Sequence, residues 1–98
     1  MSVKVTVAVA VHNGDKALVN CLDSIKNQTL KEIEVIMVDA ASDDRTAEIM
    51  KSYLSDSRFR YLRNEIDSIS QARNCAIAEA EGKYISFGDT SVIFSESL

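Results

Sequence analysis

VKVTVAVAV, at residues 3–11, has valine at every second position. The positions between the valines carry Lys4, a threonine and two alanines, so only one of them is charged. A strand with valines on one face and small residues on the other is typical of the centre of a parallel sheet covered on both faces. We therefore predict a buried strand at residues 3–11.

Helical and strand patterns alternate after this stretch. Apolar runs predict further strands at 33–38, 59–62 and 84–87. Apolar residues at helical spacing predict three helices between the strands, with stripes formed by Leu18, Cys21, Leu22 and Ile25, by Thr46, Ile49, Met50 and Tyr53 with Leu54 beside them, and by Ile69, Ala72, Ala76 and Ala80. The expected start signals are Asn13, Ser42 and Ser68, and the expected ends include Asn27 or Gln28 and Gly82.

The order βαβαβαβ predicts an α/β fold, a three-layer Rossmann-like domain with a parallel sheet. Right-handed crossovers favour the strand order 3-2-1-4, with the first two helices on one face and the third on the other. Cys21 and Cys75 would then lie on opposite faces, too far apart for a disulfide. Residues 1–98 are expected to form a single domain, with a tail at 90–98 that has no clear period.

The composition excludes several classes of protein. With 98 residues, 46% apolar and 27% charged, the chain is neither disordered nor a disulfide scaffold. It has no apolar run of membrane-spanning length and no cleavage site after its first strand, so we expect no membrane span and a cytoplasmic protein. The net charge of −4 argues against nucleic acid as a partner, and the single histidine excludes a multi-histidine metal site.

Polar residues follow three of the predicted strands. His12 and Asn13 follow the first, Asp39 the second, and Gly88-Asp89 the fourth. In an open α/β sheet, ligands bind beyond the carboxyl ends of the strands where the strand order reverses. The sequence therefore predicts a binding crevice at this edge.

Five stretches resemble the motifs of family 2 glycosyltransferases, in the family's order. They are VAVAVHNG at 7–14, CLDSIKNQT at 21–29, IMVD at 36–39, SQARN at 70–74 and GKYISF at 82–87. Ser42, Asp44 and Thr46 also resemble the family's acidic turn after its second strand. The similarity covers nearly the whole chain.

The resemblance implies the nucleotide-sugar-binding half of the GT-A fold in an inverting enzyme. It assigns His12, Asn13, Asp39 and Arg73 to the donor nucleotide. It assigns Asp89 to the diphosphate end of the donor and to a divalent cation, Mn²⁺ or Mg²⁺, which would neutralise the leaving group. The acceptor site and the catalytic base would lie after the fourth strand, so no catalytic residue is assigned and the isolated chain is expected to be inactive.

The sequence departs from the family pattern at ligand-binding positions. Ala40 replaces the second acid after the second strand, and Ala41 replaces the glycine that follows. The metal motif reads Asp89-Thr90-Ser91, so a hydroxyl stands where the family has its second carboxylate. Ala10 stands in place of the usual proline. These departures favour weak nucleotide binding and argue against a tight metal site.

Each candidate residue also has a structural interpretation. His12 could hydrogen-bond only to backbone, Asp39 could cap its turn, Arg73 could be solvated or pair with Asp39, and Asp89 could form a turn. A local basic patch is interpreted as solvated charge at a strand edge, and it consists of Arg58, Arg60 and Arg63.

Competing functions follow from these departures. One is the donor-binding half of a glycosyltransferase, and another is a degenerate or engineered domain that keeps the fold without the chemistry. A receiver-like signalling domain would need acids where His12 and Asn13 stand, so we set it aside. The unpaired edge of the fourth strand, or the tail, is a candidate surface for a homodimer.

Overall fold

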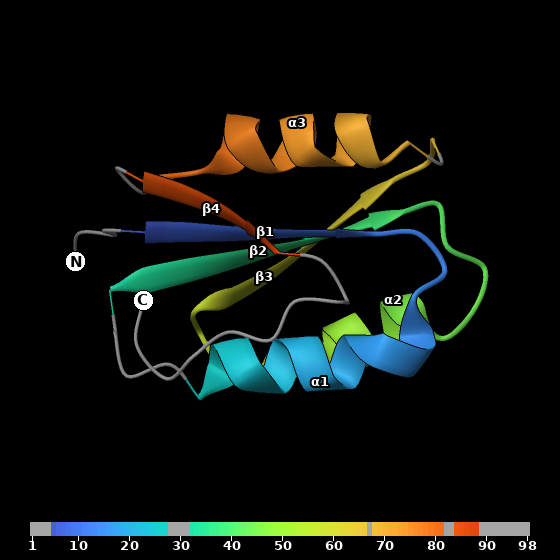
Figure 1. Ribbon diagram of the computed structural model, residues 1–98, viewed down its shortest axis with the longest axis horizontal. Coiled ribbons are helices and arrows are strands. Elements are labelled where there is room, and N and C mark those ends of the chain that lie inside the picture. Colours follow the sequence, from blue (N-terminus) through green and yellow to red (C-terminus); the bar gives the residue numbers. More distant parts are fainter. Residues whose placement is uncertain (1–4, 28–31, 67, 82–83, 89–98) are drawn as a thin grey trace.

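The structure, a computed structural model, describes residues 5–27, 32–66, 68–81 and 84–88. Strands and helices alternate through these residues (Figure 1). The elements in chain order are β1 (Val5–Val11), α1 (Asp15–Lys26), β2 (Ile33–Ala40), α2 (Thr46–Lys51), β3 (Phe59–Asn64), α3 (Ile69–Glu79) and β4 (Tyr84–Gly88).

The four strands form one parallel sheet in the order β3-β2-β1-β4, as predicted. β1 lies between β2 and β4, and its two faces are buried because its valines pack toward α1 and α2 while Ala8 and Ala10 pack toward α3. The register places Val11 beside Asp39 and Asp39 beside Arg63. The carboxyl ends of β1, β2 and β3 are therefore aligned at one edge of the sheet.

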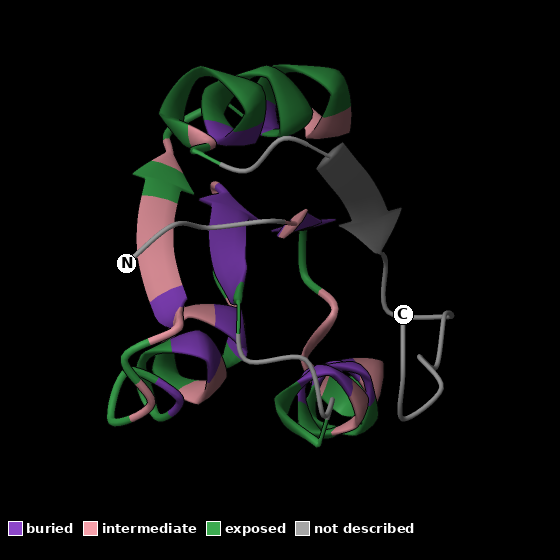
Figure 2. Ribbon diagram, turned by 90° about the vertical axis from the view of Figure 1, so that its left-hand side faces the viewer, coloured by how far each residue is buried: buried purple, intermediate pink, exposed green. Residues whose placement is uncertain are grey.

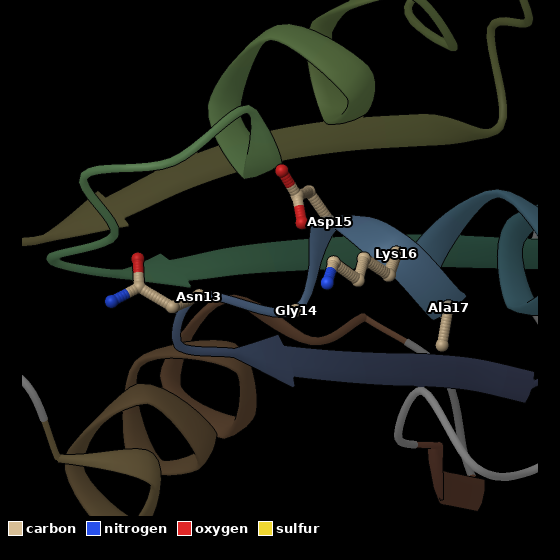
Figure 3. A pocket seen from close by; sticks show the side chains of 5 residues that line it. All are labelled: Asn13, Gly14, Asp15, Lys16 and Ala17. Atoms are coloured by element: carbon tan, nitrogen blue, oxygen red, sulfur yellow. The ribbon is translucent and has the colours of Figure 1, made fainter.

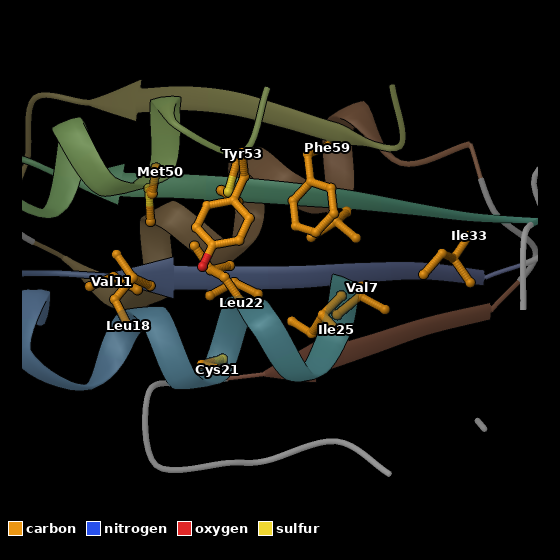
Figure 4. Close-up of a cluster of buried hydrophobic side chains, with 13 residues drawn as sticks. Val7, Val11, Leu18, Cys21, Leu22, Ile25, Ile33, Met50, Tyr53 and Phe59 are labelled. Atoms are coloured by element: carbon orange, nitrogen blue, oxygen red, sulfur yellow. The ribbon is translucent and has the colours of Figure 1, made fainter. Parts of the chain in front are cut away.

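The helices form two outer layers, with α1 and α2 on one face of the sheet and α3 on the other, which confirms the three-layer prediction (Figures 1 and 2). Larger side chains fill the α1/α2 side (Figure 4), and its buried core includes Val7, Val9, Leu18, Leu22, Ile25, Met37, Met50, Tyr53 and Phe59. Small side chains let α3 approach closely on the other side, where the buried cluster is Ala8, Ala10, Ile36, Val38, Ala40, Ala72 and Ala76. Cys21 is buried on α1 and Cys75 is exposed on α3, and no disulfide joins them.

Helix α2 is shorter than its apolar stripe predicted, because it ends at Lys51 and is followed by turns. Tyr53 lies in these turns and still reaches the core, with its ring 5.6 Å from that of Phe59. Its hydroxyl donates to Asp23 Oδ1 on α1 at 2.6 Å, and burial followed by this carboxylate raises the pKa of the phenol. Leu54, predicted beside the stripe, is exposed.

One of the three predicted N-caps is confirmed and two are wrong. Ser68 Oγ accepts the backbone N–H of Gln71 at 3.2 Å at the start of α3. α1 is preceded by Gly14 and α2 by Arg45, and neither helix has a side-chain cap. Asn13 and Ser42 make hydrogen bonds between loops instead, as described below. The predicted end at Gly82 lies outside the described residues, as do residues 1–4 and the tail at 90–98.

No helix in the described ranges is both long and apolar enough to cross a membrane.

Candidate functional site

Two loops meet beyond the carboxyl ends of β1 and β2 and are joined by hydrogen bonds. The backbone N–H of Asn13 donates to Ser42 Oγ at 2.8 Å, and the N–H of Asp43 donates to Asn13 Oδ1, also at 2.8 Å. The N–H of Gly14 donates to Thr46 Oγ1 at 3.2 Å. We call these three bonds between residues 12–14 and 41–46 the loop clasp. It fixes the position of one loop relative to the other.

Two carboxylates extend the contact between these loops. Asp44 accepts the N–H of Thr46 at 2.8 Å and that of Asp15 at 3.3 Å, while Asp15 Oδ2 accepts the N–H of Arg45 at 3.3 Å. Partial burial acts to raise the pKa of Asp44, but the hydrogen bonds from Thr46 and Asp15 outweigh it and hold the pKa below its usual value. Asp44 therefore acts as an ionised acceptor for the amide groups where the two helices begin.

Both loops contain a residue in the left-handed backbone region. Asn13 and Ala41 each have a φ of 52°. Asparagine tolerates this conformation, whereas the Cβ of an alanine makes it unfavourable. Ala41 is the position where the resemblance led us to expect glycine, and the observed φ gives the physical reason for that expectation.

Asp39 lies at the end of β2 and is completely buried. Its Oδ1 accepts the backbone N–H of Ser42 at 2.9 Å. Its Oδ2 accepts the Tyr61 hydroxyl at 3.1 Å and Arg63 Nη1 at 2.8 Å. Burial, and then the charge of Asp39, raises the pKa of the Tyr61 phenol, so this hydroxyl remains a donor. Both oxygens of the carboxylate thus have partners within the protein.

His12 is exposed, and its ring is oriented by backbone. Nδ1 lies 2.6 Å from the carbonyl oxygen of Ala40, which can only accept, so Nδ1 carries the proton of this bond. In the neutral ring Nε2 is then an acceptor, 3.4 Å from Asn13 Nδ2. These contacts agree with the interpretation of His12 as a histidine hydrogen-bonded to backbone, and its ring is exposed at this edge of the sheet.

A hollow of about 340 Å³ opens beside the clasp at the start of α1 (Figure 3). It is lined by residues 13–17, among them Asn13 and Lys16. Lys16 was not predicted as a site residue, although its place at the amino end of α1 was a usable signal. A lysine favours negatively charged ligands, whereas the N–H groups of Gly14 and Asp15 in this lining already donate to Thr46 and Asp44.

Arg73 lies on α3 with an exposed side chain. The arginine that binds the Asp39 carboxylate is Arg63. β4 ends at Gly88, and the predicted metal ligand Asp89 and its neighbour Ser91 lie outside the described residues. In the remaining, described part of the chain, no group of three or more histidine, cysteine, aspartate or glutamate side chains is arranged to hold a metal ion.

The arginines around β3 are not merely solvated, because each pairs with a carboxylate. Arg58 pairs with Asp56 at 2.8 Å. Arg60 pairs with Glu34 at 3.4 Å and with Glu79 at 3.0 Å. Arg63 was missed as a site residue because its partner comes from another strand. The register of β2 against β3 was the signal that could have identified it.

Comparisons with known proteins agree on one family. The sequence model described as Glycosyl transferase family 2 matches residues 6–96. The chain is 37% identical over its whole length to the glycosyltransferase GlyG of Streptococcus pneumoniae. The chain spans a third or less of the length of the first curated relatives that it matches, 33% in the case of GlyG.

Solved structures show the same fold. Staphylococcus aureus TarS, crystallised in complex with UDP, matches 96% of this chain with a TM-score of 0.89 and 28% identity, and the match covers 29% of the TarS chain. A mannosyltransferase from Pyrobaculum calidifontis, solved with GDP-Man and Mn²⁺, matches 96% of this chain and 29% of its own with a TM-score of 0.85. At 23% identity, the second likeness shows the fold alone.

Proposed function

The chain belongs to glycosyl transferase family 2, and from this premise we propose that it forms the part of such an enzyme that holds the nucleotide of a nucleotide-diphospho-sugar donor. The observation that carries the proposal is the loop clasp at the carboxyl edge of the sheet, with the hollow beside it. In open α/β sheets, this edge is where ligands bind. The complex of the related TarS with UDP supports a uridine nucleotide as the first ligand to test.

The candidate residues contribute in different ways under this proposal. The exposed ring of His12 offers a surface against which a base can stack, and the clasp holds Asn13 beside it. Asp39 contributes indirectly. Its buried carboxylate organises the loop at 41–45 by accepting the backbone N–H of Ser42. Lys16 supplies positive charge for a diphosphate. Contacts from Arg73 and Asp89 to the donor remain predictions from the family resemblance.

The oxygen ligands that the sequence offers do not fit a tight cation site. A divalent cation in this family would neutralise the diphosphate, and hard cations prefer carboxylate oxygens. The sequence supplies one carboxylate at Asp89, followed by hydroxyls at Thr90 and Ser91. We therefore assign no step of the proposed binding to a metal ion.

The second candidate is a domain that keeps the fold of the family but does not transfer sugar. Ala40 is buried in the cluster under α3, so it offers neither charge nor a polar atom of its side chain to a nucleotide. Ala41 keeps an unfavourable φ that a glycine would relieve. These features favour weak binding without sugar transfer.

Titration of the ¹⁵N-labelled chain with UDP, GDP and ADP tests the proposal, each with and without Mn²⁺. We expect saturable shifts of the amide signals in residues 12–16 and 41–46, and weaker UDP binding in Lys16→Ala. Lys26→Ala is the matched control, because Lys26 lies in the last turn of α1. If millimolar UDP moved no amide signal at this edge, the proposal would be wrong.

Self-association through the edge of β4 also remains a prediction. Within the described residues, β4 pairs with β1 alone. An unpaired strand edge favours association with a second chain. Sedimentation over a range of concentrations tests this, and a monomer at every concentration would contradict it.

A further inference from the structure

Arg63 connects the buried end of β2 to the loop that follows it. It lies beside Asp39 in the register of β3 against β2. Its Nη1 donates to Asp39 Oδ2 at 2.8 Å and to the carbonyl oxygen of Ser42 at 3.2 Å. One guanidinium nitrogen therefore contacts both a fixed point in the sheet and a point in the loop.

The connection continues from Arg63 to the other loop. Asp39 Oδ1 accepts the N–H of Ser42, and Ser42 Oγ accepts the N–H of Asn13. Asn13 Oδ1 in turn accepts the N–H of Asp43. Loss of Arg63 would leave the completely buried Asp39 carboxylate with only neutral donors. It would also release the Ser42 carbonyl.

The loop has a reason to relax when it is released. Ala41 holds a backbone conformation that is unfavourable for a residue with a Cβ, so the surrounding contacts must maintain it. The contacts on either side of Ala41 include the bond from Arg63 to Ser42 and the bond from His12 to the Ala40 carbonyl. The first of these two bonds is made by a guanidinium that belongs to a strand of the sheet, β3.

We propose that Arg63 is a positioning residue for the nucleotide site. It orders the loop at 41–45 and, through the clasp, the loop that carries His12, without touching the nucleotide itself. Its Nε donates to Glu65 Oε1 at 2.9 Å. The inference rests on the proposed function, because it assigns a role in UDP binding.

The test compares Arg63→Met with Arg58→Met in the full 98-residue chain. Both variants remove one positive charge and keep a long apolar side chain. Arg58 is held by Asp56 and the Lys26 carbonyl, at the amino end of β3. Amide hydrogen exchange is measured at Asn13, Ser42 and Asp43, and UDP affinity is measured by calorimetry. Arg63→Lys tests whether a positive charge without the planar guanidinium is sufficient to order the loop at 41–45.

We expect Arg63→Met to speed amide exchange at these three residues while exchange in the centres of β1 and β2 stays slow. If the ordered loop falls to about a tenth of the population, the apparent Kd for UDP rises about tenfold. Arg58→Met should change the exchange of these amides and the Kd by less than about twofold. Arg63→Lys should fall between Arg63→Met and the unmodified chain.

The outcomes separate this inference from the proposed function. Absence of UDP binding by the unmodified chain would refute the proposed function and the role of Arg63 in binding together. Unchanged amide exchange in Arg63→Met would overturn the inference while UDP binding by the unmodified chain still stood. Faster exchange with a Kd equal to that of Arg58→Met would also overturn it, because the loop order would then not matter for binding.

Discussion

The backbone N–H of Asn13 donates to the hydroxyl oxygen of Ser42 across two loops that are far apart in the chain. Ser42 is buried, so its hydroxyl is a structural acceptor and not a surface group. Asn13 returns the contact by accepting the N–H of Asp43. The two loops therefore depend on each other for their backbone hydrogen bonds.

The first prediction concerns this hydroxyl. Ser42→Ala leaves the Asn13 N–H without its acceptor, which should lower the free energy of unfolding by about 1–3 kcal/mol. Urea denaturation measures the change. Ser52→Ala is the control, because Ser52 is exposed and its hydroxyl donates only to a carbonyl in its own turn. An equal effect of both substitutions would show that the clasp contributes no special stability.

Ala41→Gly should stabilise the protein. Glycine adopts a φ of 52° without the penalty of a Cβ, and the gain should be about 1 kcal/mol, reduced by the greater freedom of glycine in the unfolded chain. Ala47→Gly, inside α2, should instead destabilise it by about 0.5–1 kcal/mol. Thermal unfolding of both variants checks the opposite signs, and destabilisation by Ala41→Gly would contradict the conformational argument.

The hydrogen bonds to the Glu34 carboxylate lead us to predict that the protein loses stability in acid. Burial acts to raise the pKa of this carboxyl, but hydrogen bonds from the Glu81 N–H, Thr6 and Arg60 outweigh burial and hold it below 4.5. The stabilising contribution is therefore complete above pH 4.5 and is lost as the pH falls through the lower, folded-state pKa. Glu34→Gln should lower the free energy of unfolding at pH 7 by about 2 kcal/mol and flatten the acid side of the profile.

The control for this profile is Glu48→Gln. Glu48 is exposed on α2 and pairs with Arg45 at 2.9 Å. Such surface pairs contribute about 0–1 kcal/mol, so this variant should keep the acid slope of the unmodified protein. Identical slopes for Glu34→Gln and the unmodified protein would show that another carboxyl governs the acid transition.

Ala40→Asp, which restores the acid expected in this family, should carry a cost in stability. Ala40 is completely buried among apolar side chains under α3, and an uncompensated buried charge costs about 3–5 kcal/mol. The control is Ala40→Asn, which introduces a side chain of the same size as aspartate without the charge. The destabilisation of the Asp variant relative to the Asn variant should grow as the pH rises from 4 to 7, measured by urea denaturation. A difference that did not change with pH would mean that the new carboxylate reaches solvent or a donor.

The strand order and the layers could be predicted because they depend on local patterns. The alternating valines of β1 and the alanines of α3 each specify a buried face. The cap at Ser68 was also correct, since that bond closes within one helical turn. The predicted helix caps at Asn13 and Ser42 were wrong. A side chain that can cap a helix can also accept a hydrogen bond from a backbone N–H in a distant loop.

The site was harder to predict than the fold for a related reason. Arg63 was interpreted as an edge charge, and Asp39 as a nucleotide contact or a turn cap. Only the register of β2 against β3 brings the two together. The positive φ of Ala41 could not be predicted either, because the sequence alone does not show that an alanine adopts a conformation that favours glycine.

The central position of β1 also constrains how the chain can be made. β1 is synthesised before the other described elements, yet one of its two neighbours, β4, is the last of them. During translation the backbone groups of β1 that pair with β4 therefore have no partner until β4 has been synthesised. Parallel sheets with such distant pairings fold slowly and expose aggregation-prone edges meanwhile. We therefore expect the nascent chain to be most prone to aggregation before Tyr84–Gly88 has been synthesised.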